Sequence, residues 1–551
     1  MKRAILLVAC ASLSIGTALS AEKIFLFRNS SHDISEFRAF AAMASRLKPY
    51  GDVQVDIGVL ADKSWYEMPE GGSPWHEYAS NASCMAKFFP HPKIAPFIPA
   101  DWVARNKELL LAKAAVLREL GLNAVFTSDD THFLPEAFFQ KYPHLRGPRV
   151  DHPRRSRQEA FAWCTDLKET RDMVEWMAAE LKRQVPEIKT MISHSNDAGG
   201  GFCWAAALYT GPNGPHSCEN RSAGIRVKEF AEAIHRGAEK GGGKISIRLD
   251  GNFWQHEDDE ILPLLPPGTY IHERDRATVD VGSLLNEAYP IRGLFDPLAV
   301  IAALGRLNDA GVRTIVIDTT AWYARTDDSL ETAAKLVEIV KESLAQPANG
   351  AVPQFSVLHK LALRWGGEKH ADALVDAFHA MNEAFRLKAA AAPGYSNMYA
   401  GVSMRHLTRP LLLRPETLAP AEESYFLPYV FNPFLSEARS DYIDLHGTRM
   451  KGPSSWDDAG LRQALSRALS AARTFEGASG APEEKWLRRL ALALKIWVSE
   501  VRSINNFYFA QLLRDRNKAV LAGEPRMPPK EYTWTGANDY LDWNEIQRDE
   551  V

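Results

Sequence analysis

Residues 106–130 read NKELLLAKAAVLRELGLNAVFTSDD, and this stretch decides the fold class. Its first part spaces apolar side chains three and four residues apart, which is the period of an amphipathic helix. Residues 123–128 then form a short run rich in β-branched and aromatic residues, which predicts a buried strand. A helix followed by a strand and an acidic pair is typical of one step in a parallel α/β sheet.

The same alternation recurs through the first 350 residues, for example in the helical pattern KETRDMVEWMAAELKRQV at 168–185. Eight strands are predicted, at residues 23–28, 53–60, 123–128, 189–195, 244–249, 269–273, 291–295 and 313–319. Eight such strands in about 300 residues favour a closed (β/α)8 TIM barrel over an open sheet. The first strand is not followed by a glycine-rich fingerprint, which argues against a dinucleotide-binding fold.

The sequence pattern changes after Pro353. Long amphipathic helical patterns follow at residues 374–392, 459–477 and 483–516. They predict a mainly helical C-terminal domain at 351–551, after a catalytic barrel at 22–350. This second domain either supports the barrel or forms one wall of its site.

The first 21 residues, MKRAILLVACASLSIGTALSA, have the pattern of a secretory signal peptide. Two cations precede an apolar stretch, and small residues surround the expected cleavage site near Ala21. A lipoprotein signal around Cys10 is the alternative. We therefore expect an exported protein, periplasmic or extracellular, and no later segment that is apolar enough to span a membrane.

The composition excludes several classes of protein. The chain has 551 residues, 46% of them hydrophobic, and a formal net charge of −4 from 65 basic and 69 acidic side chains. These proportions are those of a folded globular protein and exclude disorder, collagen and coiled coil. The charge balance argues against a nucleic-acid partner, because such proteins usually carry a basic surplus.

Four cysteines remain after the predicted signal: Cys84, Cys164, Cys203 and Cys218. In an oxidising compartment they allow two disulfides, and Cys203–Cys218 is the most plausible pair because it would close one glycine-rich loop. Four buried thiols are an equal alternative. The chain has no CxxC or HExxH spacing, so the sequence predicts no metal site and no cofactor.

In a barrel, the active site forms at the carboxyl ends of the strands. Carboxylates, amides, imidazoles and indoles follow the predicted strands there. The candidates are Asp129, Asp130 and His132 after the third; His194, Asn196, Asp197 and Trp204 at the fourth; Asp250, Asn252 and Trp254 after the fifth; Glu273 after the sixth; and Asp318 and Trp322 after the eighth. Such side chains suit a sugar, because two carboxyl groups can serve the oxocarbenium-like transition state of glycoside hydrolysis.

The run PEAFFQKYPHLRG at 135–147 resembles a loop of retaining TIM-barrel glycoside hydrolases of the β-galactosidase type. In those families the fourth strand ends in Asn-Glu, and the Glu is the acid/base. The resemblance therefore implies Asp197 as acid/base and Asn196 as a sugar contact, although Asp is one methylene shorter than Glu. The family nucleophile ends the seventh strand, which corresponds here to Asp296, or to Glu273 one strand earlier.

Each candidate also has a structural interpretation. Asp197 suits an Asx turn, and Glu273 suits a salt bridge with a nearby arginine. The pair Asp129-Asp130 resembles the adjacent acids of enzymes that use a substrate acetamido group as nucleophile, but one of the two could cap a helix. Asp318 suits either a sugar contact or a strand-end cap. The tryptophans suit either sugar stacking or packing at the barrel mouth.

Five arginines lie within twelve residues, at 146, 149, 154, 155 and 157. Arg149 and Arg154 are candidates to bind an anionic substituent of a glycan, because guanidinium groups pair with carboxylate or sulfate through two hydrogen bonds. The alternative is that these arginines lock a long loop onto neighbouring acids.

The sequence favours a glycosidase with a carbohydrate substrate. One alternative is a glycan-binding barrel that lacks a working carboxyl pair. Another is a metal-dependent barrel hydrolase, for which Asp318 is suitably placed. That class needs a His-x-His on its first strand, and Arg28-Asn29-Ser30 offers none.

Overall fold

The structure is a computed structural model. It describes residues 23–62, 83–130, 133–150, 159–194, 201–204, 214–250, 253, 255–271, 274–281, 291, 293–308, 311–318, 328–346, 350–391, 419–421, 457–516, 546 and 548.

An eight-stranded parallel sheet forms the first part of the chain. Its strands run in the order β10-β11-β1-β2-β3-β7-β8-β9. They are β1 (Lys23–Arg28), β2 (Gly51–Asp56), β3 (Asn123–Ser128), β7 (Ile188–His194), β8 (Ser246–Asp250), β9 (Thr269–Ile271), β10 (Thr278–Asp280) and β11 (Thr314–Asp318). Because β1 pairs with both β2 and β11, the first and last strands are neighbours, as they are in a TIM barrel.

The sheet curls around an interior. Arg28 at the end of β1 lies 3.7 Å from Asp250 at the end of β8, although β2, β3 and β7 lie between these strands. In a flat sheet, four steps of about 4.8 Å would separate the two strands by about 19 Å. The curl therefore brings opposite strands face to face. Within the described residues, no strand pairing joins β9 to β10, so full closure at that seam stays a prediction.

Alternate residues of the strands pack into two different apolar clusters, one inside the curled sheet and one between the sheet and the helices. Leu26, Val125, Ile192 and Val316 pack together from four different strands and fill the interior of the curled sheet. Their neighbours along the strands, such as Phe25 and Ile315, belong to the large cluster that includes the helices. This division follows from the pleat, because successive side chains of a strand point to opposite faces.

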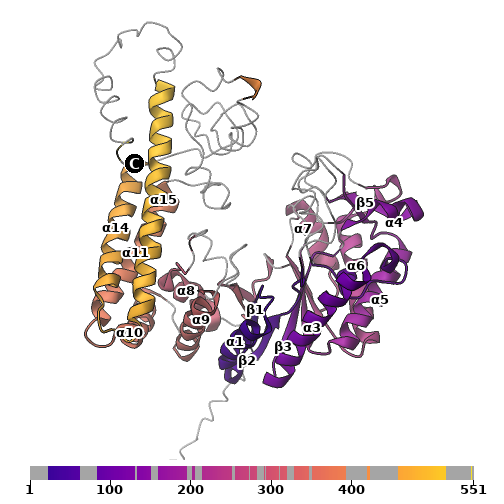
Figure 1. Cartoon of the computed structure of the whole chain (residues 1–551), viewed down its shortest axis with the longest axis horizontal. Coiled ribbons are helices and arrows are strands. Elements are labelled where there is room, and N and C mark those ends of the chain that lie inside the picture. The colour runs from indigo at the N-terminus through magenta and orange to yellow at the C-terminus, as the bar shows by residue number, and fades with distance from the viewer. Residues whose placement is uncertain are drawn as a thin grey trace, which may run out of the picture.

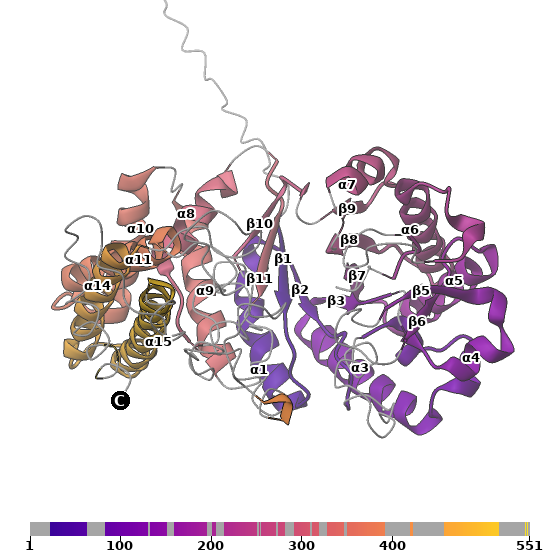
Figure 2. The ribbon, with the colours of Figure 1, turned by 90° about the horizontal axis from the view of Figure 1, so that it is seen from above.

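Helices cover the outer face of the sheet (Figure 2). They are α1 (Ile34–Ala44), α3 (Ala100–Leu120), α5 (Lys168–Gln184), α6 (Ala223–Lys240), α7 (Gln255–Ile261), α8 (Pro297–Leu304) and α9 (Asp328–Ala345). Gly121 ends α3 in the left-handed conformation, with φ 62°, and so turns the chain into β3. The helix-strand step predicted from residues 106–130 is confirmed.

The predicted seventh strand is wrong. We expected it at 291–295, but it is β10 (Thr278–Asp280), which pairs with β11. The described residues of 291–295 are not in a strand, and Asp296 caps α8 instead of ending a strand. Ile291, Leu294 and Phe295 pack against the main core just before α8 begins. An apolar run of this length does not by itself distinguish a strand from another kind of buried segment.

A small antiparallel sheet lies in what the sequence suggested was a long polar loop after β3. Its order is β4-β6-β5, with β4 (Phe133–Leu134), β5 (Arg146–Arg149) and β6 (Phe161–Trp163). The short helix α4 (Glu136–Lys141) lies between β4 and β5. This insertion therefore has its own hydrogen-bonded framework, which supports the segment that follows β6.

Beyond residue 350 the described chain is helical, as predicted. Its helices are α10 (Ala351–Gly366), α11 (Ala371–Ala391), α14 (Asp458–Gly477) and α15 (Glu484–Arg516), which stand as a bundle beside the sheet (Figure 1). Helices α8 and α9 lie between this bundle and the sheet, and one apolar cluster runs through both parts. None of the helices in the described ranges combines the length and the apolarity that crossing a membrane requires.

Polar contacts fix the helical bundle to the part of the chain that forms the curled sheet. Asp296 accepts hydrogen bonds from the backbone of Leu298 and Ala299 at the start of α8, and its other oxygen accepts one from Asn382 of α11 at 2.6 Å. Lys335 of α9 forms an ion pair with Glu483 just before α15, at 2.9 Å. Asp296 is buried, so its contacts exclude water and join the two parts at one point.

We expect Asp296→Ala to lower the free energy of unfolding by roughly 2–3 kcal/mol, because it removes a helix cap and leaves Asn382 without its acceptor. Urea denaturation measures the change. The matched control is Asp372→Ala, since that aspartate in the first turn of α11 is exposed and pairs only at the surface with His359. Equal losses of unfolding free energy in the two variants would show that the buried contacts of Asp296 do not stabilise the contact between bundle and sheet.

Candidate active site at the barrel mouth

A group of charged side chains lies at the carboxyl end of the sheet. Arg28 is central, with its Nη1 3.7 Å from Asp250 Oδ2 and its Nε 3.7 Å from Asp318 Oδ2. Asp129, just after β3, is near enough to act on the charge of Arg28. We call Arg28, Asp129, Asp250 and Asp318 the mouth cluster. The side chains of Arg28, Asp250 and Asp318 are 25–31% exposed, so a ligand can reach them.

Electrostatics hold the arginine in its charged form. Burial lowers the pKa of Arg28, but surrounding carboxylates outweigh this effect and raise the pKa above its ordinary value. These carboxylates belong to Asp318, Asp56, Asp250 and Asp129. The sequence analysis identified three of them as candidates because they follow strands, and the structure brings these three together around one guanidinium.

The adjacent acids Asp129 and Asp130 have different surroundings. Asp129 is partly exposed, whereas Asp130 is only 1% exposed. The Oδ2 of Asp130 accepts hydrogen bonds from the backbone N–H of Met85, at 3.0 Å, and from the hydroxyl of Ser128. Its Oδ1 is buried without a hydrogen-bond partner among the described residues. Asp130 therefore lies behind Asp129 and is shielded from solvent.

Burial raises the pKa of Asp130 to about 6. The bonds from Ser128 and Met85 oppose this rise, the neighbouring charge of Asp129 adds to it, and the buried Lys87 opposes it. Desolvation is the largest effect because a carboxylate loses most of its hydration at such a depth.

Two further acids at strand ends were missed by the sequence analysis. Asp56 ends β2, and its oxygens accept hydrogen bonds from the backbone of Gly58 and from the amide and hydroxyl of Thr127. These bonds tie the ends of β2 and β3 together. Asp280 ends β10, level with Val316 of β11, and was missed because the seventh strand was predicted elsewhere. The sequence signal that could have identified Asp280 is an acidic residue directly after the two β-branched residues Thr278 and Val279.

Trp204 is the described member of the three predicted sugar-stacking tryptophans. Its indole N–H donates to the carbonyl of Pro215 at 3.0 Å, and the ring packs against a group of buried cysteines. Its backbone has φ 61°, which is uncommon for a bulky residue. These contacts make Trp204 part of the loop framework, and its partly exposed side chain stays available as a sugar platform.

The described arginines of the 146–157 loop are paired. Arg146 forms an ion pair with Glu136 and stacks on the rings of Phe139 and Phe161. Arg149 forms an ion pair with Glu159 at 3.1 Å. These contacts favour the loop-locking interpretation for both side chains.

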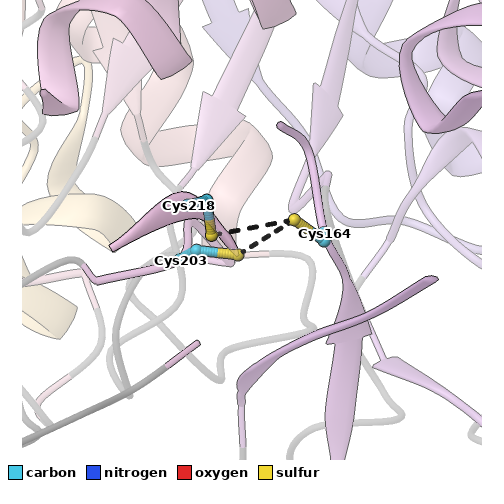
Figure 3. A group of neighbouring side chains, drawn as sticks. All are labelled: Cys164, Cys203 and Cys218. Carbon is cyan, nitrogen blue, oxygen red and sulfur yellow. Dashed lines mark hydrogen bonds between the residues drawn. The ribbon is translucent and has the colours of Figure 1, made fainter. Parts of the chain in front are cut away.

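Cys84, Cys164, Cys203 and Cys218 are buried free thiols, which is the second of the two predicted alternatives, and the Cys203–Cys218 disulfide is not formed in this structure. Cys164, Cys203 and Cys218 nevertheless come together (Figure 3). The thiol of Cys203 lies 3.5 Å from that of Cys164, and the hydrogen bond between them lowers the pKa of Cys164 to about 7. We call these three residues the cysteine triad.

The other predicted site residues lie outside the described residues, and their roles stay predictions. They are His132, the side chain of His194, Asn196, Asp197, Asn252, Trp254, Glu273, Trp322 and Arg154. The strands β7, β8, β9 and β11 end next to most of them.

Comparison with known proteins supports the fold. No family model matches the chain, and the curated proteins contain no match. A solved structure described as a GH138 enzyme targeting pectin rhamnogalacturonan II is similar over 96% of this chain, with a TM-score of 0.51 and 10% identity. The match covers 62% of that enzyme's chain, so this protein spans less than two thirds of its length. The likeness is therefore one of overall fold.

Two other solved glycosidases match at lower TM-scores. The GH36 α-galactosidase AgaA from Geobacillus stearothermophilus matches at 0.32 and 10% identity, over 60% of this chain and 43% of that one. A pneumococcal exo-β-D-N-acetylglucosaminidase with GH20 modules matches at 0.31 and 11% identity, over 62% of this chain and 92% of that one. These scores do not reach the level of a shared overall fold. The resemblance to β-galactosidase-type enzymes stays a prediction.

We expect Asp130→Asn to stabilise the protein more at pH 8 than at pH 4, by roughly 2–3 kcal/mol. The folded-state pKa of about 6 lies above the usual value, so the folded chain loses stability as the pH rises from about 4 to about 6. The amide cannot ionise and avoids this loss. Urea denaturation of both proteins at the two pH values measures the difference.

The matched control has the opposite sign. Asp33 caps α1, and hydrogen bonds from Ser35 and from the backbone of Glu36 lower its pKa. Asp33→Asn should therefore lose stability at pH 8 relative to pH 4. The same pH trend in both variants would exclude burial of Asp130 as the cause.

Proposed function

We propose that this protein is a glycoside hydrolase that cleaves a glycan with a pair of carboxyl groups. The observation that supports this most directly is the mouth cluster, where acids from separate strands gather around Arg28 and remain partly exposed. Such an arrangement supplies both acceptors for sugar hydroxyls and carboxyl groups for acid–base or nucleophilic catalysis. The fold likeness to a glycoside hydrolase agrees with this proposal.

Asp250 and Asp318 are proposed as acceptors for sugar hydroxyls. Both lie 3.7 Å from Arg28, so two such spans and the width of one guanidinium limit the distance between their Oδ2 atoms to about 10 Å. One sugar ring can therefore contact both. Arg28 approaches the Oδ2 atom of each carboxylate and so holds the two side chains near one another.

In the proposed reaction, Asp197 protonates the leaving oxygen. The second carboxyl group is Glu273 or Asp129, acting as nucleophile or as base for a water molecule. Asp129 is partly exposed and acts on the charge of Arg28, and Glu273 lies outside the described residues. Asp130 is then a positioning residue, since its buried carboxyl group holds the turn that presents Asp129.

The finer properties of the substrate belong to the same proposal. An anionic glycan would require Arg154 and its neighbours, because Arg146 and Arg149 are paired with glutamates. Export to the periplasm or the medium follows from the signal-like N-terminus and is proposed on that basis alone.

A glycan-binding protein without catalysis is the second candidate. It is supported by the contacts of Arg28 with Asp250 and Asp318, because carboxylates held in this way suit the binding of sugar hydroxyls without catalysis. A glycoside hydrolase would turn over its glycan, whereas a glycan-binding protein would bind it unchanged.

We expect the full chain to hydrolyse at least one member of a panel of aryl glycosides and pectic oligosaccharides. Asp197→Asn should lower kcat by about 10²-fold or more, and so should whichever of Asp129→Asn and Glu273→Gln removes the second catalytic carboxyl group. Asp250→Asn and Asp318→Asn should chiefly raise KM. Release of the aglycone and of reducing ends measures these constants.

Asp372→Asn is the control, because this exposed aspartate lies on the helical bundle and should leave kcat unchanged. Glycan binding by calorimetry with no turnover would support the binding protein instead. Full activity of both Asp197→Asn and Asp129→Asn would exclude the proposed mechanism.

A further inference from the structure

The cysteine triad joins three segments that are distant in the sequence. Cys164 directly follows β6, Cys203 lies in the turn after β7, and Cys218 ends the short helix η5 (His216–Cys218). The three are 0%, 0% and 2% exposed. Their sulfur atoms point toward one another (Figure 3), with 3.5 Å from Cys203 to Cys164, 4.0 Å from Cys164 to Cys218, and all three within 4.8 Å.

We propose that Cys164, Cys203 and Cys218 form a structural site for a thiophilic divalent cation such as Zn²⁺. In a tetrahedral zinc site each sulfur lies about 2.3 Å from the ion, which places neighbouring sulfurs about 3.8 Å apart. The spacings in the triad lie around this value. A disulfide instead needs two sulfurs about 2.05 Å apart and would leave the third thiol outside the bond.

A buried ion pair already holds the same three segments together. Arg226 of α6 donates hydrogen bonds to the backbone carbonyls of Cys203 and Cys218, the latter at 2.6 Å. Its Nε lies 3.2 Å from the carboxylate of Asp166, two residues after Cys164. The side chains of Arg226 and Asp166 are 3% and 4% exposed. The backbone at each cysteine is therefore fixed without the ion, which reduces the cost of assembling the ligands.

The chemistry of this site balances simply. Each thiol releases one proton when it binds, so one Zn²⁺ and three thiols give a tris-thiolate complex with one negative charge and three protons. The guanidinium of Arg226 lies beside this charge. A water molecule would complete the tetrahedral coordination.

Such a site would bear on the barrel mouth. Trp204 follows Cys203 directly and packs against the triad, and Gly214 fits closely between Cys203 and Trp204. A side chain at Gly214 would meet the Cβ of Cys203 at 2.9 Å. An ion at the triad would therefore fix Trp204 and Gly214 relative to Cys203.

Zinc titration of the full chain tests the proposal. The chain is reduced, freed of metal with a chelator and titrated with Zn²⁺ against a chromogenic chelator. We expect one equivalent to bind and to raise the thermal midpoint. Co²⁺ in its place should give the near-ultraviolet charge-transfer band of thiolate ligands. Cys164→Ser, Cys203→Ser and Cys218→Ser should each weaken Zn²⁺ binding by at least tenfold.

Cys84→Ser is the matched control, because Cys84 is also buried but lies beside Lys87 and Asp130 instead of the triad. It should retain one equivalent of Zn²⁺. No binding by the reduced wild-type chain would overturn the proposal, whether or not the variants fold. A metal-free chain isolated without reductant that contains a disulfide within the triad would overturn it too. These readouts do not depend on glycosidase activity.

Discussion

The contact between Arg28 and Asp250 is possible only because the sheet curls. Arg28 is on β1, Asp318 on the adjacent β11, and Asp250 on β8, which is four strands away. Beneath them, the apolar cluster of Leu26 and its partners fills the interior. This apolar cluster closes the interior below the charged side chains. The charges would be costly to bury more deeply, and in their present position solvent still reaches them. The position of every candidate at the mouth depends on this arrangement.

The segments that follow β3 and β7 are held in place by polar contacts and by the cysteine triad, as well as by the main core. The insertion after β3 is built on its own small sheet, and Arg226 joins its end to the turn after β7. A barrel gives strand ends fixed positions, but the long connections between strands need supports of their own. In this protein the described supports include the buried pair of Arg226 and Asp166 and the cysteine triad.

The sequence predicted the regular elements well because their signals are local. Residues 106–130 show helix and strand through side-chain spacing alone, and the structure has α3 and β3 there. The seventh strand failed because three residues, Thr278–Asp280, are too few to give a period, while 291–295 is apolar for reasons of packing. Asp250 and Asp318 were found because acids at strand ends converge in any barrel. The cysteine triad could not be found, because its members are 39 and 15 residues apart and no short motif contains them.

The charges of the mouth cluster restrict which ligands can bind there. The partly exposed members of the mouth cluster are three carboxylates and Arg28, whereas the neighbouring cations Lys87 and Arg248 are buried. The described surface that a ligand meets there therefore carries more negative than positive groups. Hydroxyl groups of a neutral sugar can donate to such oxygens, whereas a carboxylate or sulfate on the ligand would be repelled unless another cation faced it. Arg146 and Arg149 are compensated by Glu136 and Glu159. A charged ligand would therefore need a cation outside the mouth cluster, and the two described arginines of the 146–157 loop do not supply a free one.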